Sequence, residues 1–93
     1  MRVFKNAVPI DDNEHSFKMP EGEILFVAEQ HGAISFWFES PALDPSMGGH
    51  LEDDTRTFRV FGTGHIIPEG YLYQGTAMMM GGNLVVHLYE VIK

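Results

Sequence analysis

The fold is decided by residues 23–39, which read EILFVAEQHGAISFWFE. In the second half of this stretch, Ile34, Phe36 and Phe38 alternate with other residues, and a period of two is typical of a half-buried β-strand. His31-Gly32 interrupts the pattern, and glycine in a two-residue connection favours the positive φ angles of a tight hairpin. The segment therefore predicts two antiparallel strands joined by a short turn.

The same alternation recurs on both sides of this hairpin, and clusters of Pro, Gly, Asp and Asn separate the alternating runs. No helical period of useful length and no internal repeat occur. Strands are predicted over residues 3–10, 15–19, 23–29, 33–39, 55–61, 71–80 and 84–92. Together they predict a single all-β domain spanning residues 1–93, a small antiparallel β-sandwich or partly open barrel.

Composition narrows the class of protein. The chain has 93 residues, of which 44% are hydrophobic and 12% aromatic, which is too apolar for a disordered tail and enough for one modest core. It has no cysteine, so disulfides, thiolate metal sites and cysteine nucleophiles are excluded. No apolar run reaches the roughly 20 residues that a membrane-spanning helix needs, and no signal-peptide pattern occurs, so we expect a cytoplasmic protein.

The net charge of −7 is unevenly distributed, because residues 11–54 contain eleven acidic residues and a single lysine. Duplex nucleic acid is bound mainly by Lys and Arg at its phosphates, so this acidic block disfavours binding to DNA or RNA duplexes. The longest connection, 41–54, lies in the block, and a loop of this length in a small domain is either functional or mobile. The simpler interpretation of the charge is a solvated surface that keeps the protein soluble.

Gly62-Thr63-Gly64-His65 is the most distinctive short motif. Two glycines allow a sharp turn that exposes main-chain amides, as in anion-binding nests, and the threonine and histidine side chains add hydrogen-bond donors. The known phosphate loops, GxxxxGKS/T and GxGxxG, are both absent. The motif predicts an anion-binding loop, and the alternative is a glycine bulge with His65 bonded to a neighbouring carbonyl.

Further ligand-binding candidates come from the strands. Arg56 and Arg59 fall on opposite faces of one predicted strand, so a single guanidinium fork is expected to hold a phosphate or carboxylate. Trp37 and Tyr73 offer flat faces on which a purine stacks, with core packing as the alternative. For the arginines the alternative is a surface ion pair with an acidic residue, namely Glu39, Asp53 or Asp54.

Metal binding and catalysis have little support in the pattern. The five histidines are scattered and form no i, i+2 or i, i+4 pair of the kind that metal sites use. No Gly-x-Ser-x-Gly motif or comparable nucleophile arrangement occurs. We therefore expect no metal, no cofactor and no enzymatic activity.

Met78-Met79-Met80 is unusual for a strand, because three soft, unbranched side chains suit an adaptable contact surface. The last two predicted strands are apolar on both faces. A small β domain with surplus apolar faces often covers them by self-association, so we expect a homo-oligomer, a dimer or a tetramer.

Three segments of the C-terminal half carry a resemblance to a known family: RTFRVFGTGH at 56–65, YQGT at 73–76 and GGNLVVHLYE at 81–90. Together with the MPEG turn at 19–22 and Trp37, they resemble a family of small, uncharacterised accessory proteins of tailed bacteriophages and prophages. The resemblance spans nearly the whole chain and implies an accessory protein rather than an enzyme. Among small phage β proteins, anti-CBASS sponges bind cyclic-nucleotide immune signals as oligomers without cleaving them.

This resemblance and the residues together favour a protein that sequesters a small anionic ligand, such as a cyclic di- or trinucleotide, to counter host defence. In this hypothesis Arg56 or Arg59 and the amides of residues 62–65 hold the phosphates, and the bases stack on Trp37 or Tyr73. The alternative is a protein–protein inhibitor or adaptor that docks on a host or phage protein through residues 41–54. An enzyme that degrades a nucleotide signal is a third hypothesis, and product formation distinguishes it.

Overall fold

Antiparallel strands account for most of the computed structural model, which describes residues 1–41 and 54–92. The strands are β1 (Arg2–Pro9), β2 (His15–Met19), β3 (Glu23–Gln30), β4 (Ala33–Ser40), β5 (Asp54–Gly62), β6 (Tyr71–Met79) and β7 (Leu84–Val91). Each boundary lies within one residue of its predicted position, so the all-β prediction is confirmed. The predicted loop 41–54 lies outside the described residues except at its two ends. None of the helices in the described ranges has the length and apolar character needed to cross a membrane.

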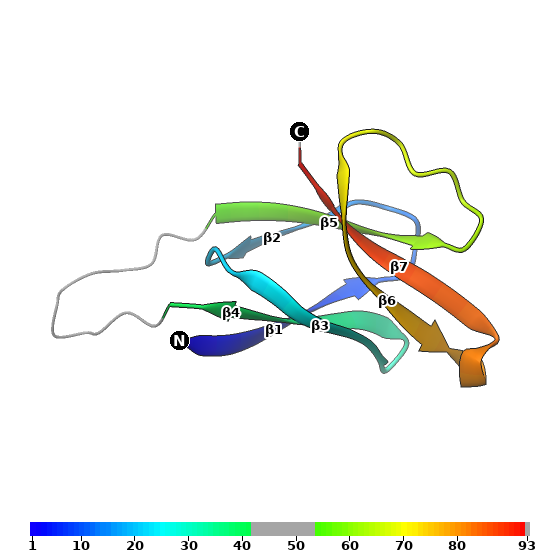
Figure 1. Cartoon of the computed structure of the whole chain (residues 1–93), viewed down its shortest axis with the longest axis horizontal. Coiled ribbons are helices and arrows are strands. Elements are labelled where there is room, and N and C mark those ends of the chain that lie inside the picture. The colour runs from blue at the N-terminus through cyan, green and yellow to red at the C-terminus, as the bar shows by residue number, and fades with distance from the viewer. Residues whose placement is uncertain (42–53, 93) are drawn as a thin grey trace, which may run out of the picture.

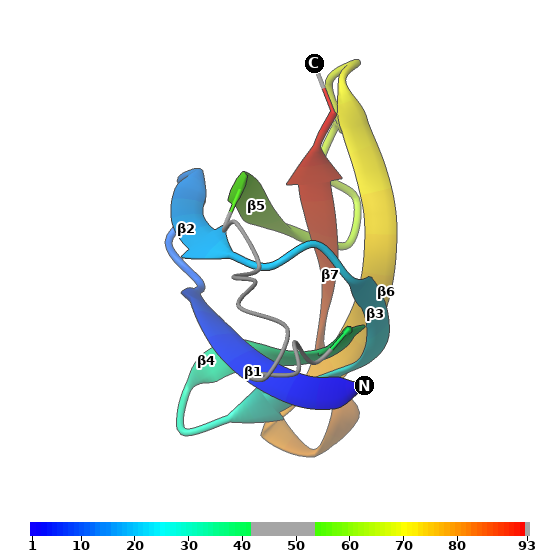
Figure 2. The ribbon, with the colours of Figure 1, turned by 90° about the vertical axis from the view of Figure 1, so that its left-hand side faces the viewer.

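The strands form two sheets, with the orders β1–β4–β3 and β2–β5–β7–β6. Figure 1 shows the two sheets as layers, and Figure 2, viewed along the long axis, shows β1 near β2 on one side and β3 beside β6 on the other. The described ladders do not join the sheets into a closed barrel. The architecture is therefore the open sandwich, the first of the two predicted forms.

The core lies between the sheets and is built from the alternating apolar positions. In β4 the inward side chains Ile34, Phe36 and Phe38 are at most 2% exposed, which confirms the predicted buried face. Phe36 packs against Phe58 of β5 with ring centroids 4.5 Å apart, and so connects the two sheets. Burying a side chain of this size contributes about 1.5–3 kcal/mol, so this aromatic cluster is a main source of the attraction between the layers.

Two turns account for the sharp reversals of the chain. His31 and Gly32 adopt φ angles of 53° and 82°, which confirms the predicted two-residue hairpin between β3 and β4. β6 ends at Met79, one residue earlier than predicted, because Met80 adopts a φ of 51° and begins the short 3₁₀ helix η2 (Met80–Gly82). The strained Met80 is tolerated where the following glycines supply the rest of the turn.

Close approach between segments requires a glycine at two positions. At Gly75, where a bulge interrupts the β6–β7 ladder, an added Cβ atom would overlap Cγ2 of Val27 and lie 2.9 Å from its Cβ. This glycine therefore lets β3 cross β6 at the edge where the two sheets meet. At Gly22 an added Cβ would overlap the main-chain oxygen of Glu39, so the β2–β3 connection lies directly against β4.

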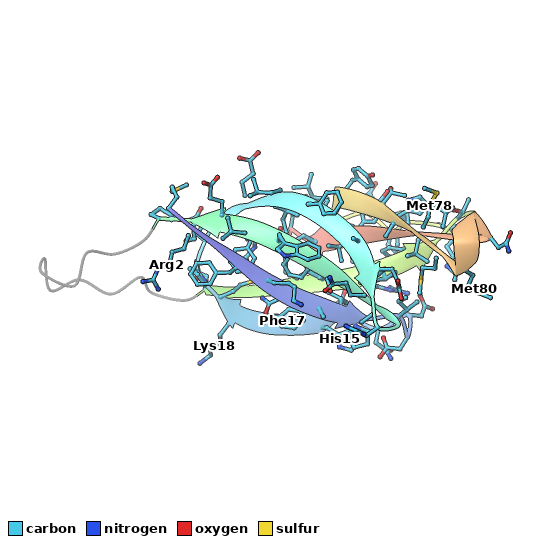
Figure 3. The ribbon with its side chains drawn as sticks, turned by 90° about the horizontal axis from the view of Figure 1, so that it is seen from below. Arg2, His15, Phe17, Lys18, Met78 and Met80 are labelled. Atoms are coloured by element: carbon cyan, nitrogen blue, oxygen red, sulfur yellow. The ribbon has the colours of Figure 1, made fainter. Side chains whose placement is uncertain are left out.

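The four-stranded sheet is longer than its partner at one end. The β6–β7 hairpin extends past the β3–β4 turn, as Figure 1 shows. Met78 and Met80 project at this end in Figure 3, and they are 70% and 74% exposed. Leu84, at the start of β7, is 39% exposed there.

Candidate ligand-binding site

Arg56 of β5 forms a structural ion pair. Its Nε and Nη2 atoms donate to the two carboxylate oxygens of Glu90 in β7, each at 2.7 Å, and Nη1 donates to the main-chain oxygen of Gly22 at 2.8 Å. The two side chains are 15% and 14% exposed. Among the described residues the partner is therefore Glu90 rather than Glu39 or Asp54, and Asp53 lies outside them. Three of the five N–H donors of Arg56 are thus used within the chain.

Arg59 lies on the opposite, outer face of β5 and is only partly satisfied. Its Nη2 atom donates to Asp12 at 3.1 Å and Nη1 to the Tyr71 hydroxyl at 3.5 Å, while Nε is buried and has no partner among the described residues. The guanidinium carbon lies 4.6 Å from the centroid of the Phe61 ring. The hydrogen bond with Tyr71, followed by that with Asp12, raises the pKa of Arg59, so the side chain stays charged.

The Gly62–His65 segment does not present four free amides. The Gly62 amide donates to Nδ1 of His65 at 3.2 Å, the Thr63 amide to the Val85 oxygen at 3.3 Å, and the His65 amide to the Gly62 oxygen at 3.2 Å. Gly64 has a φ of 90°, which explains the glycine at this turn. Three of the four donors expected to cradle an anion are thus bonded within the chain, and His65 accepts a hydrogen bond from an amide rather than donating to a carbonyl.

Thr63 instead begins a chain of side-chain hydrogen bonds along the outer face of the sheet. Its Oγ1 lies 3.0 Å from Nε2 of His87, and Nδ1 of His87 lies 2.9 Å from Oγ1 of Thr76. Thr76 also pairs with the hydroxyl of Tyr73. These hydrogen bonds join the segments that contain Thr63, His87 and Thr76, which are distant in the sequence, on one face of the sheet.

One contact determines which group donates in each of these hydrogen bonds. Thr63 Oγ1 lies 3.0 Å from the Val85 main-chain oxygen, which only accepts, so the Thr63 hydroxyl donates there. His87 then donates from Nε2 to Thr63 and accepts from Thr76 at Nδ1. His87 therefore does not act as a base toward Thr63, and this pair lacks the nucleophile–base geometry of a hydrolase.

Sequence reasoning did not select His87 or Thr76. The signal that locates them is the hairpin register, because the short turn between β6 and β7 pairs Thr76 with His87. Period-two alternation puts His87 on the face of Tyr89, and the bulge between Tyr73 and Gly75 brings Thr76 to the same face as Tyr73.

The two aromatic candidates lie on different sheets. Tyr73 is 52% exposed and stands edge-on to Tyr89, with ring centroids 5.6 Å apart. Trp37 lies on the outer face of the three-stranded sheet, 5.8 Å from the ring of Phe26. The structure therefore brings Tyr73, but not Trp37, to the face of Arg59 and Thr63.

A shallow hollow of about 310 Å³ lies beside Arg59, and it is lined by Asp12, Arg59, Phe61, His65 and Ile66. The Arg59 guanidinium and the His65 ring are the only basic groups of this lining, and the Asp12 side chain, 67% exposed, already bonds the guanidinium. Within residues 1–41 and 54–92 no three His, Asp or Glu side chains gather in a way that would hold a metal ion.

The family model that is described as a domain of unknown function, DUF7352, matches residues 1–93. No curated protein and no solved structure matches the chain.

Proposed function

We propose that this protein, which belongs to the DUF7352 family of domains of unknown function, binds a small ligand with an anionic group and a flat ring. It retains this ligand without cleaving it. A cyclic di- or trinucleotide immune signal fits this chemistry. Because the sequence resembles phage accessory proteins, the proposed role is to sequester such a signal in the host cytoplasm and so counter host defence.

The observation that carries the proposal is the state of Arg59. Its guanidinium is held against Phe61, its Nε donor is buried without a partner in the described part of the chain, and Nη2 bonds only an exposed carboxylate. A phosphate that displaces Asp12 would exchange one carboxylate contact for a bidentate pair, and such pairs are among the stronger hydrogen-bonded contacts. His65, in the same hollow, accepts from the Gly62 amide at Nδ1, so its Nε2 atom carries the proton and adds a second donor.

Tyr73 supplies the surface for a ring. In the sheet register Arg59 pairs with Tyr89, which pairs with Tyr73, so the three form one cross-strand row on the outer face. Two strand spacings separate Arg59 from Tyr73 by about 10 Å, a span that a nucleotide bridges from phosphate to base. The Thr63 hydroxyl donates to Val85, so His87 does not activate it as a nucleophile.

Calorimetry against a panel of cyclic di- and trinucleotides tests the proposal. We expect Arg59→Gln to weaken binding at least tenfold, because a hydrogen bond to a charged group contributes about 1.5–3 kcal/mol. Arg2→Gln is the matched control, since Arg2 is an exposed arginine at the start of β1, and it should bind like the wild type. Asp12→Asn, which removes the competing carboxylate, should tighten binding.

The fate of the ligand separates retention from catalysis. Heat denaturation after overnight incubation should return the nucleotide intact. A silent panel at micromolar concentration, or equal affinity of Arg59→Gln and the wild type, would overturn the proposed function. Accumulation of a cleaved product would replace it with a degrading enzyme.

A second candidate, docking on a host or phage protein, is favoured by Phe26, which is 63% exposed beside Trp37. The acidic segment 41–54 remains the proposed contact, and Phe26 is a second, apolar candidate contact. A pull-down from host lysate with Phe26→Ser, compared with a chain in which Asp53 and Asp54 are replaced by Asn, separates the two surfaces. Retention of the captured protein by both variants would contradict this candidate.

A further inference from the structure

A larger hollow is lined by residues of the β1–β2 turn, the end of β5 and the start of β7. Figure 1 shows that the β6–β7 hairpin extends past the β3–β4 turn at this end of the sandwich. Its volume is about 600 Å³, within the range of roughly 300–1,000 Å³ that is common for small-molecule sites. The apolar walls are Ile10, Val60, Leu84 and Val86. Val60 and Val86 are 4% and 3% exposed, whereas Leu84 is 39% exposed at the mouth.

The charged groups of this hollow are acidic. Asp11 and Asp12, from the turn between β1 and β2, belong to its lining, and none of the lining residues is Lys or Arg. The hydrogen bond from His15, followed by that from the Asn13 amide, lowers the pKa of Asp11, so this carboxylate stays ionised. Arg59 pairs with Asp12 but lies on the other side, in the smaller hollow.

These features select one class of occupant. An apolar body gains free energy when it covers exposed side chains such as Leu84, at about 25 cal/mol per Å² removed from water. Ionised carboxylates beside an apolar wall attract a cation and repel a phosphate or carboxylate. Neither a nucleotide nor a fatty acid matches this combination.

We propose that the hollow between β5, β7 and the β1–β2 turn binds a small organic cation with an apolar body, a ring that carries an alkylammonium group. The ring lies against Leu84 and Val86, and the ammonium group lies near Asp11 and Asp12. This site adjoins the proposed nucleotide site and takes a ligand of opposite charge.

The two sites share part of their walls. Asp12 and His65 line both hollows, so a change in either residue affects both ligands. Removing the charge of Asp12 frees Arg59 for an anion and at the same time weakens the attraction for a cation. One substitution therefore has opposite effects on the two proposed ligands.

Amide NMR titration of the full chain tests the proposal with 2-phenylethylammonium. We expect saturable shifts at Ile10, Leu84 and Val86 at millimolar ligand. The matched probes are 3-phenylpropionate, which has the ring and the wrong charge, and ethylammonium, which has the charge and no ring. Neither should saturate these residues.

Variants then locate the site. Asp12→Asn should weaken phenylethylammonium about two- to fivefold, the effect of one exposed charge. Asparagine tolerates the φ of 64° at this position, so the turn is kept. Asp54→Asn, at the opposite end of β5, is the control and should leave the affinity unchanged. Leu84→Trp, which fills the mouth, should abolish the shifts.

The outcomes are distinguishable from those of the nucleotide experiment. Equal binding of phenylpropionate, unchanged binding by Asp12→Asn, or the absence of shifts at millimolar phenylethylammonium would each overturn the cation site. A nucleotide that still binds more tightly to Asp12→Asn would leave the proposed function standing. If no nucleotide binds while phenylethylammonium still gives the expected shifts, the proposed function alone would be overturned.

Discussion

Replacing Arg56 by Met should destabilise the protein strongly, because it strands a buried carboxylate. Glu90, whose side chain is 14% exposed in the wild type, would lose two 2.7 Å hydrogen bonds and its counter-ion. Among the described residues, Gln74 would then be its one remaining side-chain donor. Breaking a buried ion pair costs about 3–5 kcal/mol, and partial exposure puts this pair at the lower end, about 3 kcal/mol. A domain of this size is stable by about 5–14 kcal/mol, so a substantial share would be lost.

Thermal unfolding measures this loss directly. For a chain of 60–100 residues, 1 kcal/mol lowers Tm by about 4–8 °C, so the Arg56→Met variant should melt about 12–24 °C lower. Glu90→Leu should have a similar cost, and the double variant should recover at least about 1 kcal/mol relative to the sum. A Tm drop of only a few degrees, or strict additivity of the two substitutions, would refute the structural role of Arg56 and return its guanidinium to the ligand-binding candidates.

Two further predictions concern the fold. Gly75→Ala should cost about 1–3 kcal/mol in urea unfolding, because the new methyl group overlaps the buried Val27, and Val27→Ala in the same chain should reduce that cost; a loss below about 0.5 kcal/mol would contradict the close crossing of β3 and β6. Asp11→Asn should lower the free energy of unfolding except at acidic pH, because the pKa of Asp11 is lowered in the folded state. The stabilisation by Asp11 is present above about pH 3.9, the unfolded pKa, and disappears as the pH falls through the folded pKa. Urea midpoints of the wild type and the variant should therefore converge below about pH 4, and a constant difference down to pH 2.5 would count against the bond with His15.

The strands were predictable because their alternation is local. Ile34, Phe36 and Phe38 must share a face whatever their partners are, so the period of two identified the buried side of β4. The hairpin at His31-Gly32 is equally local, since its backbone angles depend on two residues. The one-residue error at the end of β6 arose because Met80 adopts a positive φ, which is rare for a side chain of this type.

The site was less predictable because it depends on pairing between distant strands. Nothing near Arg56 in the sequence indicates Glu90, which meets it only after β5 and β7 pair in one register. The amides of Gly62–His65 had the composition of an anion-binding loop, but the loop closes on itself and on Val85 once β7 lies alongside. Glycine content therefore indicated the sharp turn correctly without indicating whether its donors were free.

Of the two candidate arginines, these constraints leave Arg59 as the proposed anion contact, and this bears on the number of subunits. A cyclic dinucleotide carries two phosphates and two bases, whereas one chain offers one such guanidinium and one exposed Tyr73 on that face. A two-fold dimer would present two of each, which matches the symmetry of the ligand. The proposed sponge should accordingly bind one cyclic dinucleotide for every two chains, with light scattering reporting a dimer. Tight binding of one ligand to each monomeric chain would show that the anion is held by other groups, and it would remove Arg59 from the centre of the site.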